Sequence, residues 1–176
     1  MNDRHYHTNR HLYFAYGANT NHSAMAYRCP HAEFLGTGNL LGHRLVFRGV
    51  ADIEAHSAGS VAGALWRISD DHLDALDAFE GYPRLYIRKA VHVHMNPPVF
   101  RDLEDRVTAL VYQMAGRNQH SVQPAYPMYL DTLAEGYADC RLPKDQLVAA
   151  TRHAYQAPRR IWAPTRTSRQ WAQQED

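Results

Sequence analysis

The glutamate at position 80 is the side chain of this sequence best suited to acid–base chemistry. Ser69 as N-cap and Gly81 as stop predict a helix, whose spacing places Glu80 on the same inward face as Leu73 and Leu76. Burial against that face and the negative end of the helix dipole both raise the pKa of the carboxyl group. Such a glutamate can accept and return a proton near neutral pH. The alternative is a glutamate that bends out to water at a frayed helix end.

A glycine turn near the N-terminus is the second candidate. Residues 13–16 (YFAY) are an aromatic, apolar run typical of a buried strand, which ends at Tyr16 and is followed by Gly17, Ala18 and Asn19 as a tight turn. Because glycine tolerates positive φ, the N–H groups of Gly17 and Ala18 can point the same way and hold an anion. On chemistry alone, such a turn is one half of an active site. The alternative is a strand end with no function.

Other side chains that could bind a metal ion or react as nucleophiles have no partners at suitable spacing. His92 and His94 place two imidazoles on one strand face, but no third and fourth metal ligands accompany them, so an exposed polar face is favoured over a metal site. Cys29 and Cys140 are far apart, which predicts reduced, packed thiols. The sequence contains no P-loop, dinucleotide fingerprint or G-x-S-x-G elbow.

Length and charge restrict the class of protein. The 176 residues suit one domain, and a net charge of +1 argues against a protein that covers many phosphates. No run approaches the roughly 20 apolar residues of a membrane span, and the first residues lack the apolar region of a secretory signal. We therefore expect a cytoplasmic protein with no membrane or nucleic-acid partner. The basic tail, with Trp162 and Trp171, leaves nucleic-acid binding as an alternative that salt-dependent binding would reveal.

Periodicity and turn residues predict the elements that position these side chains. Residues 61–68 are apolar on both alternate sets, as in a central strand, and residues 86–94 alternate with Tyr86 and Arg88 on the polar face. Residues 32–47 predict two extended pieces joined by glycine bends, and the small polar residues 48–60 predict a loop. We expect a further strand at 107–114 and helices at 23–27, 69–81, 128–137 and 144–155.

Several segments, in this order, resemble the γ-glutamylcyclotransferase-like (AIG2-like) family. They are residues 12–19 (LYFAYGAN), 28–30 (RCP), 42–47 (GHRLVF), 63–66 (GALW), 76–83 (LDAFEGYP) with Tyr86 and Arg88, 127–129 (PMY), Gly136, and 142–143 (LP). From the extent of this resemblance we expect a family domain over residues 12–156. A flexible His-rich leader over residues 1–11 and a basic C-terminal tail over residues 157–176 lie outside it.

The resemblance implies an α+β fold, with a small barrel-like mixed β-sheet flanked by helices and a pocket at its open end. Enzymes of this family cyclise a γ-glutamyl group to 5-oxoproline and release the attached amine, without a metal or organic cofactor. Their catalytic carboxylate matches Glu80, their substrate-holding Y-G-S-N loop matches residues 16–19, and a pocket tyrosine matches Tyr129. Ala18 stands where the family usually has serine, which puts substrate preference in question more than reaction type.

We therefore expect a small γ-glutamyl substrate, with Glu80 acting as base and then as acid while loop 17–19 holds the γ-carbonyl oxygen. Arg44 or Arg88 is expected to pair with the substrate α-carboxylate, although Arg88 also suits an acidic structural neighbour. A binding or regulatory module on the same scaffold is the alternative.

The identity of the released amine and the oligomeric state, including a homodimer, are left open by the sequence. A free amino acid, a lysine ε-amine, a polyamine and an antibiotic precursor are all candidates for the amine. The glutathione-specific branch of the family carries leucine where this chain has Asn19, which argues against glutathione as the substrate.

Overall fold

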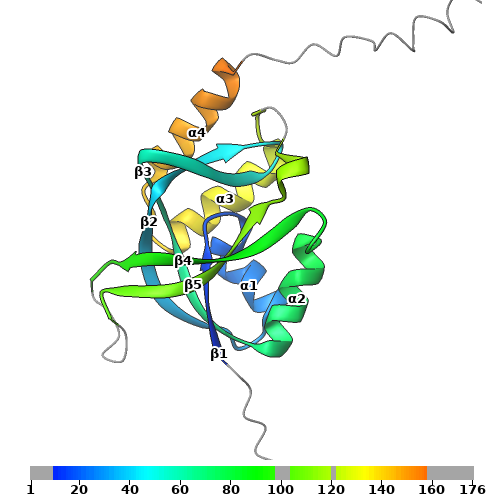
Figure 1. Cartoon of the computed structure of the whole chain (residues 1–176), viewed down its shortest axis with the longest axis vertical. Helices are drawn as coiled ribbons and strands as arrows, with labels where there is room; N and C mark the ends of the chain where they lie inside the picture. Colours follow the sequence, from blue (N-terminus) through cyan, green and yellow to red (C-terminus); the bar gives the residue numbers. More distant parts are fainter. Residues whose placement is uncertain (1–9, 98–103, 120–121, 158–176) are drawn as a thin grey trace, which may run out of the picture.

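Five β-strands close into a barrel in the computed structural model, which describes residues 10–97, 104–119 and 122–157 (Figure 1). Neighbouring strands pair antiparallel except β1 and β5, which run parallel and close the barrel in the order β1-β3-β2-β4-β5. The strands are β1 (Arg10–Ala15), β2 (Glu33–Phe47), β3 (Ala51–Ser69), β4 (Tyr86–Met95) and β5 (Arg106–Met114). The predicted α+β fold with a small mixed barrel is thereby confirmed.

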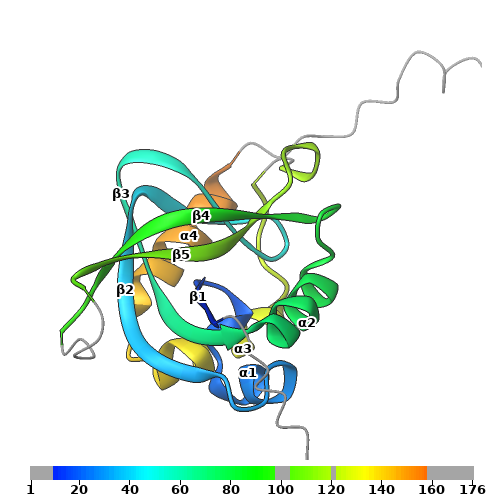
Figure 2. The same ribbon diagram turned by 60° about the horizontal axis from the view of Figure 1, so that its bottom comes forward.

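Four α-helices lie outside the sheet, with α1 beside α2 (Figure 2). Two 3-10 turns, η1 (Ala18–Thr20) and η2 (Gly116–Asn118), follow β1 and β5. The helices are α1 (His22–Arg28), α2 (Asp70–Glu80), α3 (Pro127–Asp139) and α4 (Lys144–Gln156). All four predicted helices are therefore confirmed, with bounds that shift by no more than two residues. No helix in the described part of the chain is long and apolar enough to cross a membrane.

The loop predicted for residues 48–60 is wrong over most of its length. Strand β3 begins at Ala51 and pairs with β2 from Phe47 back to Glu33. Residues 55–58 are exposed and small or polar, so they carry no apolar alternation. Ala55 pairs with His43 of β2, and residues 56–59 lie in the register shift before Ser60 pairs with Leu41. The two extended pieces predicted for residues 32–47 form one strand, whose register shifts around Gly36 and Gly42.

The interior of the barrel is apolar and continuous with the contacts to the helices. Phe14 of β1, Leu65 of β3 and Leu76 of α2 are fully buried in the same cluster. Residues 61–66 are buried throughout, which confirms the prediction of a central strand there. Both Cys29 and Cys140 are free and buried, as expected.

Some predictions concern residues that the structure does not describe. The His-rich leader falls mostly on residues 1–9, and the tail with Trp162 and Trp171 falls almost wholly on residues 158–176, which lie outside the described residues. The described chain starts with β1 at Arg10, two residues before the start predicted for the domain.

Candidate active site

A cavity of about 250 Å³ lies where the end of β1, the end of α2 and the start of β3 meet. It brings together all the predicted site residues except the two candidate arginines, Arg44 and Arg88. The lining residues are Tyr13, Tyr16, Gly17, Ala18, Asn19, Val50, Ala51, Phe79, Glu80, Leu85, Tyr86, Tyr112 and Tyr129. Its size suits a small molecule, and its lining combines many aromatic groups with few polar ones, as is typical of ligand pockets.

Helix α2 ends where the sequence predicts, and this places Glu80 at the cavity. The Ser69 side chain accepts a hydrogen bond from the N–H of His72, which caps the first turn. Gly81 takes the left-handed conformation with φ of 65°, and its N–H bonds to the carbonyl of Asp77. Glu80 is therefore the last helical residue, followed at once by a change of chain direction.

The Glu80 side chain points into the cavity rather than into the packed core, which corrects the direction predicted from helical spacing. Leu76, one turn earlier, is fully buried, whereas Glu80 is half-buried. Desolvation raises the pKa of Glu80 from 4.5 to about 7, and the Arg28 charge and the Asn19 hydrogen bond oppose this rise. Glu80 can therefore exchange a proton near neutral pH, as predicted.

The Asn19 side chain makes three hydrogen bonds, one of which holds the Glu80 carboxylate. Its amide nitrogen donates to Glu80 Oε1 at 3.0 Å and to the Tyr13 hydroxyl at 2.9 Å, while its amide oxygen accepts from Arg28 Nη1 at 2.8 Å. Because both ends of the amide are engaged, the orientation of the group is defined. Asn19 thus positions the carboxylate, a role that differs from the contact with the γ-carbonyl oxygen predicted for it.

Arg28 is a charged residue beside the cavity that sequence reasoning did not assign to the site. Its guanidinium carbon lies 3.7 Å from the centroid of the Phe79 ring, in addition to the hydrogen bond to Asn19. It is the last residue of α1 and belongs to the RCP segment that contributes to the family resemblance. That segment was the only sequence signal for it, because neither periodicity nor spacing links residue 28 to residue 80.

Gly17 is required because neighbouring atoms lie close to its Cα, and not because its φ is positive, which corrects the prediction. Gly17 has φ of −111°. A Cβ atom there would lie 3.0 Å from the Tyr129 hydroxyl and 3.3 Å from the Ala51 Cβ. Gly17 and Ala18 begin the 3-10 turn, whose carbonyls accept from the N–H groups of Thr20 and Asn21. The first N–H groups of a helical turn have no acceptor within that turn.

Two tyrosine hydroxyls bind the backbone of Ala51, which lines the cavity. The N–H of Ala51 donates to the Tyr129 hydroxyl at 3.2 Å, and the Tyr86 hydroxyl donates to the carbonyl of Ala51 at 2.8 Å. Burial raises the pKa of Tyr129 to about 12, despite hydrogen bonds from the backbone of Ala51 and Ala18. Burial likewise raises the pKa of Tyr86. Both phenols are neutral at physiological pH and act as hydrogen-bonding groups.

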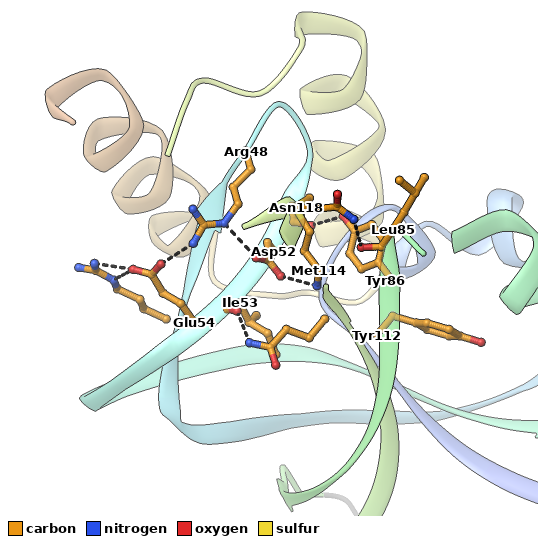
Figure 3. A network of polar contacts seen from close by, with 12 residues as sticks. Arg48, Asp52, Ile53, Glu54, Leu85, Tyr86, Tyr112, Met114 and Asn118 are labelled. Atoms are coloured by element: carbon orange, nitrogen blue, oxygen red, sulfur yellow. Dashed lines mark hydrogen bonds and ion pairs between the residues drawn. The ribbon is translucent and has the colours of Figure 1, made fainter. Parts of the chain in front are cut away.

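The buried Asp52 of β3 forms an ion pair with Arg48 and a hydrogen bond with the backbone of β5 (Figure 3). The Asp52 side chain is fully buried, and its two oxygens accept from Arg48 Nε at 3.0 Å and from the N–H of Met114 at 2.9 Å. Arg48 also bonds Glu54 at 2.6 Å. Since Asp52 follows Ala51 directly, this network anchors the backbone that lines the cavity.

Neither arginine predicted to bind a substrate carboxylate lines the cavity. Arg88 Nε lies 3.4 Å from Asp77 Oδ1, and its guanidinium carbon lies 4.5 Å from the Tyr82 ring centroid. This is the structural pairing with an acidic neighbour that the sequence left open. Arg44 bonds Glu54 through Nε and Nη2.

The two histidines on β4 do not form part of a larger cluster of ligands in the described chain. His92 and His94 are exposed, and Nδ1 of His92 lies 3.2 Å from the Thr108 hydroxyl. Residues 10–97, 104–119 and 122–157 contain no group of three or more His, Cys, Asp or Glu side chains placed to hold a metal ion.

Comparison with solved structures shows the same fold in several proteins. A structure named gamma-glutamyl cyclotransferase aligns over 89% of this chain and 93% of its own length, at 20% identity and a TM-score of 0.66. An uncharacterized protein from Homo sapiens aligns over 89% and 92%, at 21% identity and a TM-score of 0.66. An AIG2-like protein from Mus musculus aligns over 69% and 82%, at 24% identity and a TM-score of 0.52. No curated protein matches the sequence.

The sequence itself matches the model of one protein family. That family is described as "Gamma-glutamyl cyclotransferase, AIG2-like", and the match spans residues 13–131. The span contains the second half of β1, all of β2 to β5 and all of the cavity residues named above. This chain belongs to the gamma-glutamyl cyclotransferase, AIG2-like family.

Proposed function

We propose that this protein cyclises a γ-glutamyl amide to 5-oxoproline and releases the amine, with Glu80 as the proton carrier. The observation that carries the proposal is the Glu80 carboxylate in the cavity, held by Asn19 and raised in pKa to about 7. Family membership supports the same reaction class.

The chemistry requires one group that first takes and later returns a proton. Glu80 takes a proton from the substrate α-ammonium, which frees the nitrogen to attack the γ-carbonyl carbon. A new C–N bond closes the five-membered ring, and the ring nitrogen then gives up a second proton. The original amide C–N bond breaks as Glu80 passes a proton to the departing nitrogen. The α-ammonium thus loses two protons, both of which end on the released amine, and the products are 5-oxoproline and an ammonium ion.

Negative charge on the γ-carbonyl oxygen requires hydrogen-bond donors at the loop. We assign this role to the backbone N–H groups of Gly17 and Ala18, because both residues line the cavity at the start of η1. Without substrate the backbone of Ala18 bonds the Tyr129 hydroxyl, and the substrate oxygen shares this donor. A preorganised donor of this kind contributes about 3 kcal/mol to stabilising the transition state. A backbone donor does not depend on the side chain, so Ala18 in place of the usual serine is compatible with the reaction. The Tyr129 hydroxyl supports the loop through its hydrogen bond with the backbone of Ala18.

The direct test is incubation of the purified protein with a panel of γ-glutamyl amides. The expected result is equal amounts of 5-oxoproline and free amine, released at a rate that follows the protein concentration. The reaction is expected to persist with a chelator, because every step is assigned to side chains and backbone of the chain. Binding of a γ-glutamyl amide without release of either product would support a binding module instead.

The pH dependence gives a second test. Activity is expected to rise as pH passes through about 7, because Glu80 must be ionised to accept the first proton. Since the Arg28 charge lowers this pKa, Arg28→Gln is expected to move the rise to higher pH. Measurement of kcat/KM from about pH 3.5 to 9, with protein shown to stay folded at the acid end, detects both effects.

Two control variants show whether the shift seen in Arg28→Gln comes from the loss of the Arg28 charge. Arg28→Lys retains the charge and is expected to keep the rise near its parental pH. Arg67→Gln removes a charge that pairs with Glu33 outside the cavity, and is expected to leave the profile unchanged. A rise near pH 4.5 in the parental protein would contradict the assignment to a desolvated Glu80.

A further inference from the structure

Two peptide units of the loop carry the N–H groups assigned above to the γ-carbonyl oxygen. The N–H of Gly17 shares a planar unit with the carbonyl of Tyr16, and the N–H of Ala18 shares one with the carbonyl of Gly17. In a trans peptide unit the C=O and N–H bonds point in opposite directions. A group that holds either carbonyl from outside the cavity therefore also sets the direction of the N–H on the other side of that unit.

Thr20 holds the unit that carries the Ala18 N–H. Its hydroxyl donates to the carbonyl oxygen of Gly17 at 2.8 Å, and its backbone N–H donates to the same oxygen at 3.0 Å. Thr20 is fully buried and does not line the cavity. On the other side of the unit, the backbone of Ala18 bonds the Tyr129 hydroxyl, which does line it. Because this bond lowers the pKa of the phenol, Ala18 is the donor, and its N–H points to the cavity.

Helix α3 fixes Thr20 in this position. Gly136 of α3 lies so close that a Cβ atom there would overlap the Thr20 hydroxyl oxygen. The Cys140 thiol, directly after α3, donates to the carbonyl of Thr20 at 3.1 Å. The side chain and the backbone of Thr20 are therefore both held, and the hydroxyl has a defined direction towards the loop.

Tyr137 holds the unit that carries the Gly17 N–H. Its buried hydroxyl donates to the carbonyl of Tyr16 at 3.4 Å and accepts from Gln146 Nε2 at 2.5 Å. Gln146 Nε2 also donates to the carbonyl of Ala62 at 3.0 Å, and Gln146 Oε1 accepts from the N–H of Ala62 at 2.7 Å. Since Gln146 is fixed by β3 and donates to the phenol, the hydroxyl proton of Tyr137 is left for the carbonyl of Tyr16.

We propose, on the basis of the function proposed above, that Thr20 and Tyr137 are positioning residues of the reaction, each holding one loop carbonyl so that the N–H of the same unit is aimed at the γ-carbonyl oxygen. Neither side chain touches the substrate, because neither lines the cavity. Donors that are already aimed need no reorganisation as negative charge develops on the oxygen. A hydrogen bond to the carbonyl also polarises the unit and strengthens its N–H as a donor. Loss of either hydroxyl therefore lowers kcat more than it raises KM.

Two substitutions of Thr20 test the proposal with the γ-glutamyl amide that the parental protein uses best. Thr20→Val removes the hydroxyl and nearly keeps the volume of the side chain, and we expect kcat for release of 5-oxoproline to fall about tenfold. This is less than the roughly 100- to 1,000-fold loss for removing a donor outright, because the backbone N–H of residue 20 still holds the Gly17 carbonyl. KM is expected to change by less than about twofold. Thr20→Ser keeps the hydroxyl and is expected to keep kcat within about twofold.

Tyr137→Phe tests the other carbonyl, and Thr37→Val is the matched control. We expect Tyr137→Phe to lower kcat by about three- to fivefold, a smaller loss because its hydrogen bond of 3.4 Å is longer and weaker. The Thr37 hydroxyl accepts from Asn96 Nδ2 at 3.1 Å, and Thr37 does not line the cavity. Thr37→Val removes a hydroxyl with no contact to the loop and is expected to change neither kcat nor KM.

The pH profile shows whether the loop amides or Glu80 have been disturbed. Thr20 follows Asn19, whose amide nitrogen donates to Glu80 Oε1, so a variant that only loosens the turn changes the surroundings of Glu80. We expect the rise in activity to stay at its parental pH in Thr20→Val, with kcat lower at every pH. A positioning role for the amides predicts this combination, whereas a general loosening of the turn predicts a shifted rise.

The outcomes separate the two proposals. If the parental protein releases 5-oxoproline and Thr20→Val keeps the parental kcat, the inference is wrong and the proposed function stands. An equal fall in kcat for Thr20→Ser, or a shifted pH rise in Thr20→Val, also overturns the inference. Tyr137→Phe is judged by the same kcat, KM and pH criteria, and it decides the question where Thr20→Val does not fold. If no amide gives 5-oxoproline, the proposed function fails, and this inference fails with it.

Discussion

Replacing Glu80 by glutamine is expected to lower kcat by roughly 100- to 10,000-fold, the range typical for loss of a general acid–base group. Glutamine has nearly the same shape, and its carbonyl oxygen can still accept the hydrogen bond that Asn19 donates at 3.0 Å. It cannot take a proton from the substrate ammonium. We therefore expect KM to change little, and single-turnover release of 5-oxoproline to measure the loss directly.

The stability of Glu80→Gln provides the control for folding. Because the folded protein holds the Glu80 pKa at about 7, against an ordinary value of 4.5, it binds the proton more tightly than the unfolded chain does. The parental protein therefore loses stability as pH rises from about 4.5 through about 7, and the glutamine variant does not share this loss. At pH 8 we expect Glu80→Gln to melt at or above the parental temperature. A variant that is fully folded and turns over at the parental rate would refute the role of Glu80.

Replacing Asp52 by alanine is expected to cost about 3–5 kcal/mol of unfolding free energy, the usual effect of removing one partner of a buried ion pair. Asp52 is fully buried, so its loss leaves the N–H of Met114 without its acceptor and removes one of the two carboxylates that bond Arg48 (Figure 3). Denaturant unfolding followed by circular dichroism measures the change.

Two further variants show whether burial is the cause. Glu54→Ala removes a carboxylate from the same network, but its side chain is 25% exposed, so we expect a loss of about 1 kcal/mol or less. Asp52→Asn keeps an acceptor and is expected to fall between the two. Equal losses for Asp52→Ala and Glu54→Ala would contradict the energetic role assigned to the buried pair.

Local signals in the sequence were sufficient for several elements. Helix α2 is specified within its own residues by the Ser69 cap and the Gly81 stop, so its end at Glu80 could be predicted. Residues 61–66 are apolar on both faces because both faces are covered, and their pattern predicted the central strand. The ordered motifs also identified the family, since they depend on the succession of residues and not on their distances in space.

Only the tertiary structure decided how these pieces meet. Asn19 and Glu80 are 61 positions apart, and Arg28 reaches Phe79 only because α1 packs beside α2. Helical spacing gave Glu80 an inward direction but could not distinguish a cavity from packed core. Residues 55–60 carry no large apolar side chain, and β3 continues through them between the pairs that Ala55 and Ser60 make with β2.

The sequence by itself determined the family, the helices and the presence of a carboxylate at the end of α2. The structure decided which groups surround that carboxylate, because desolvation and hydrogen bonding depend on contacts made when the barrel closes. Arg28, Asn19 and Phe79 come from different elements, and no local pattern links them. The pKa of Glu80 is therefore a property of the assembled fold.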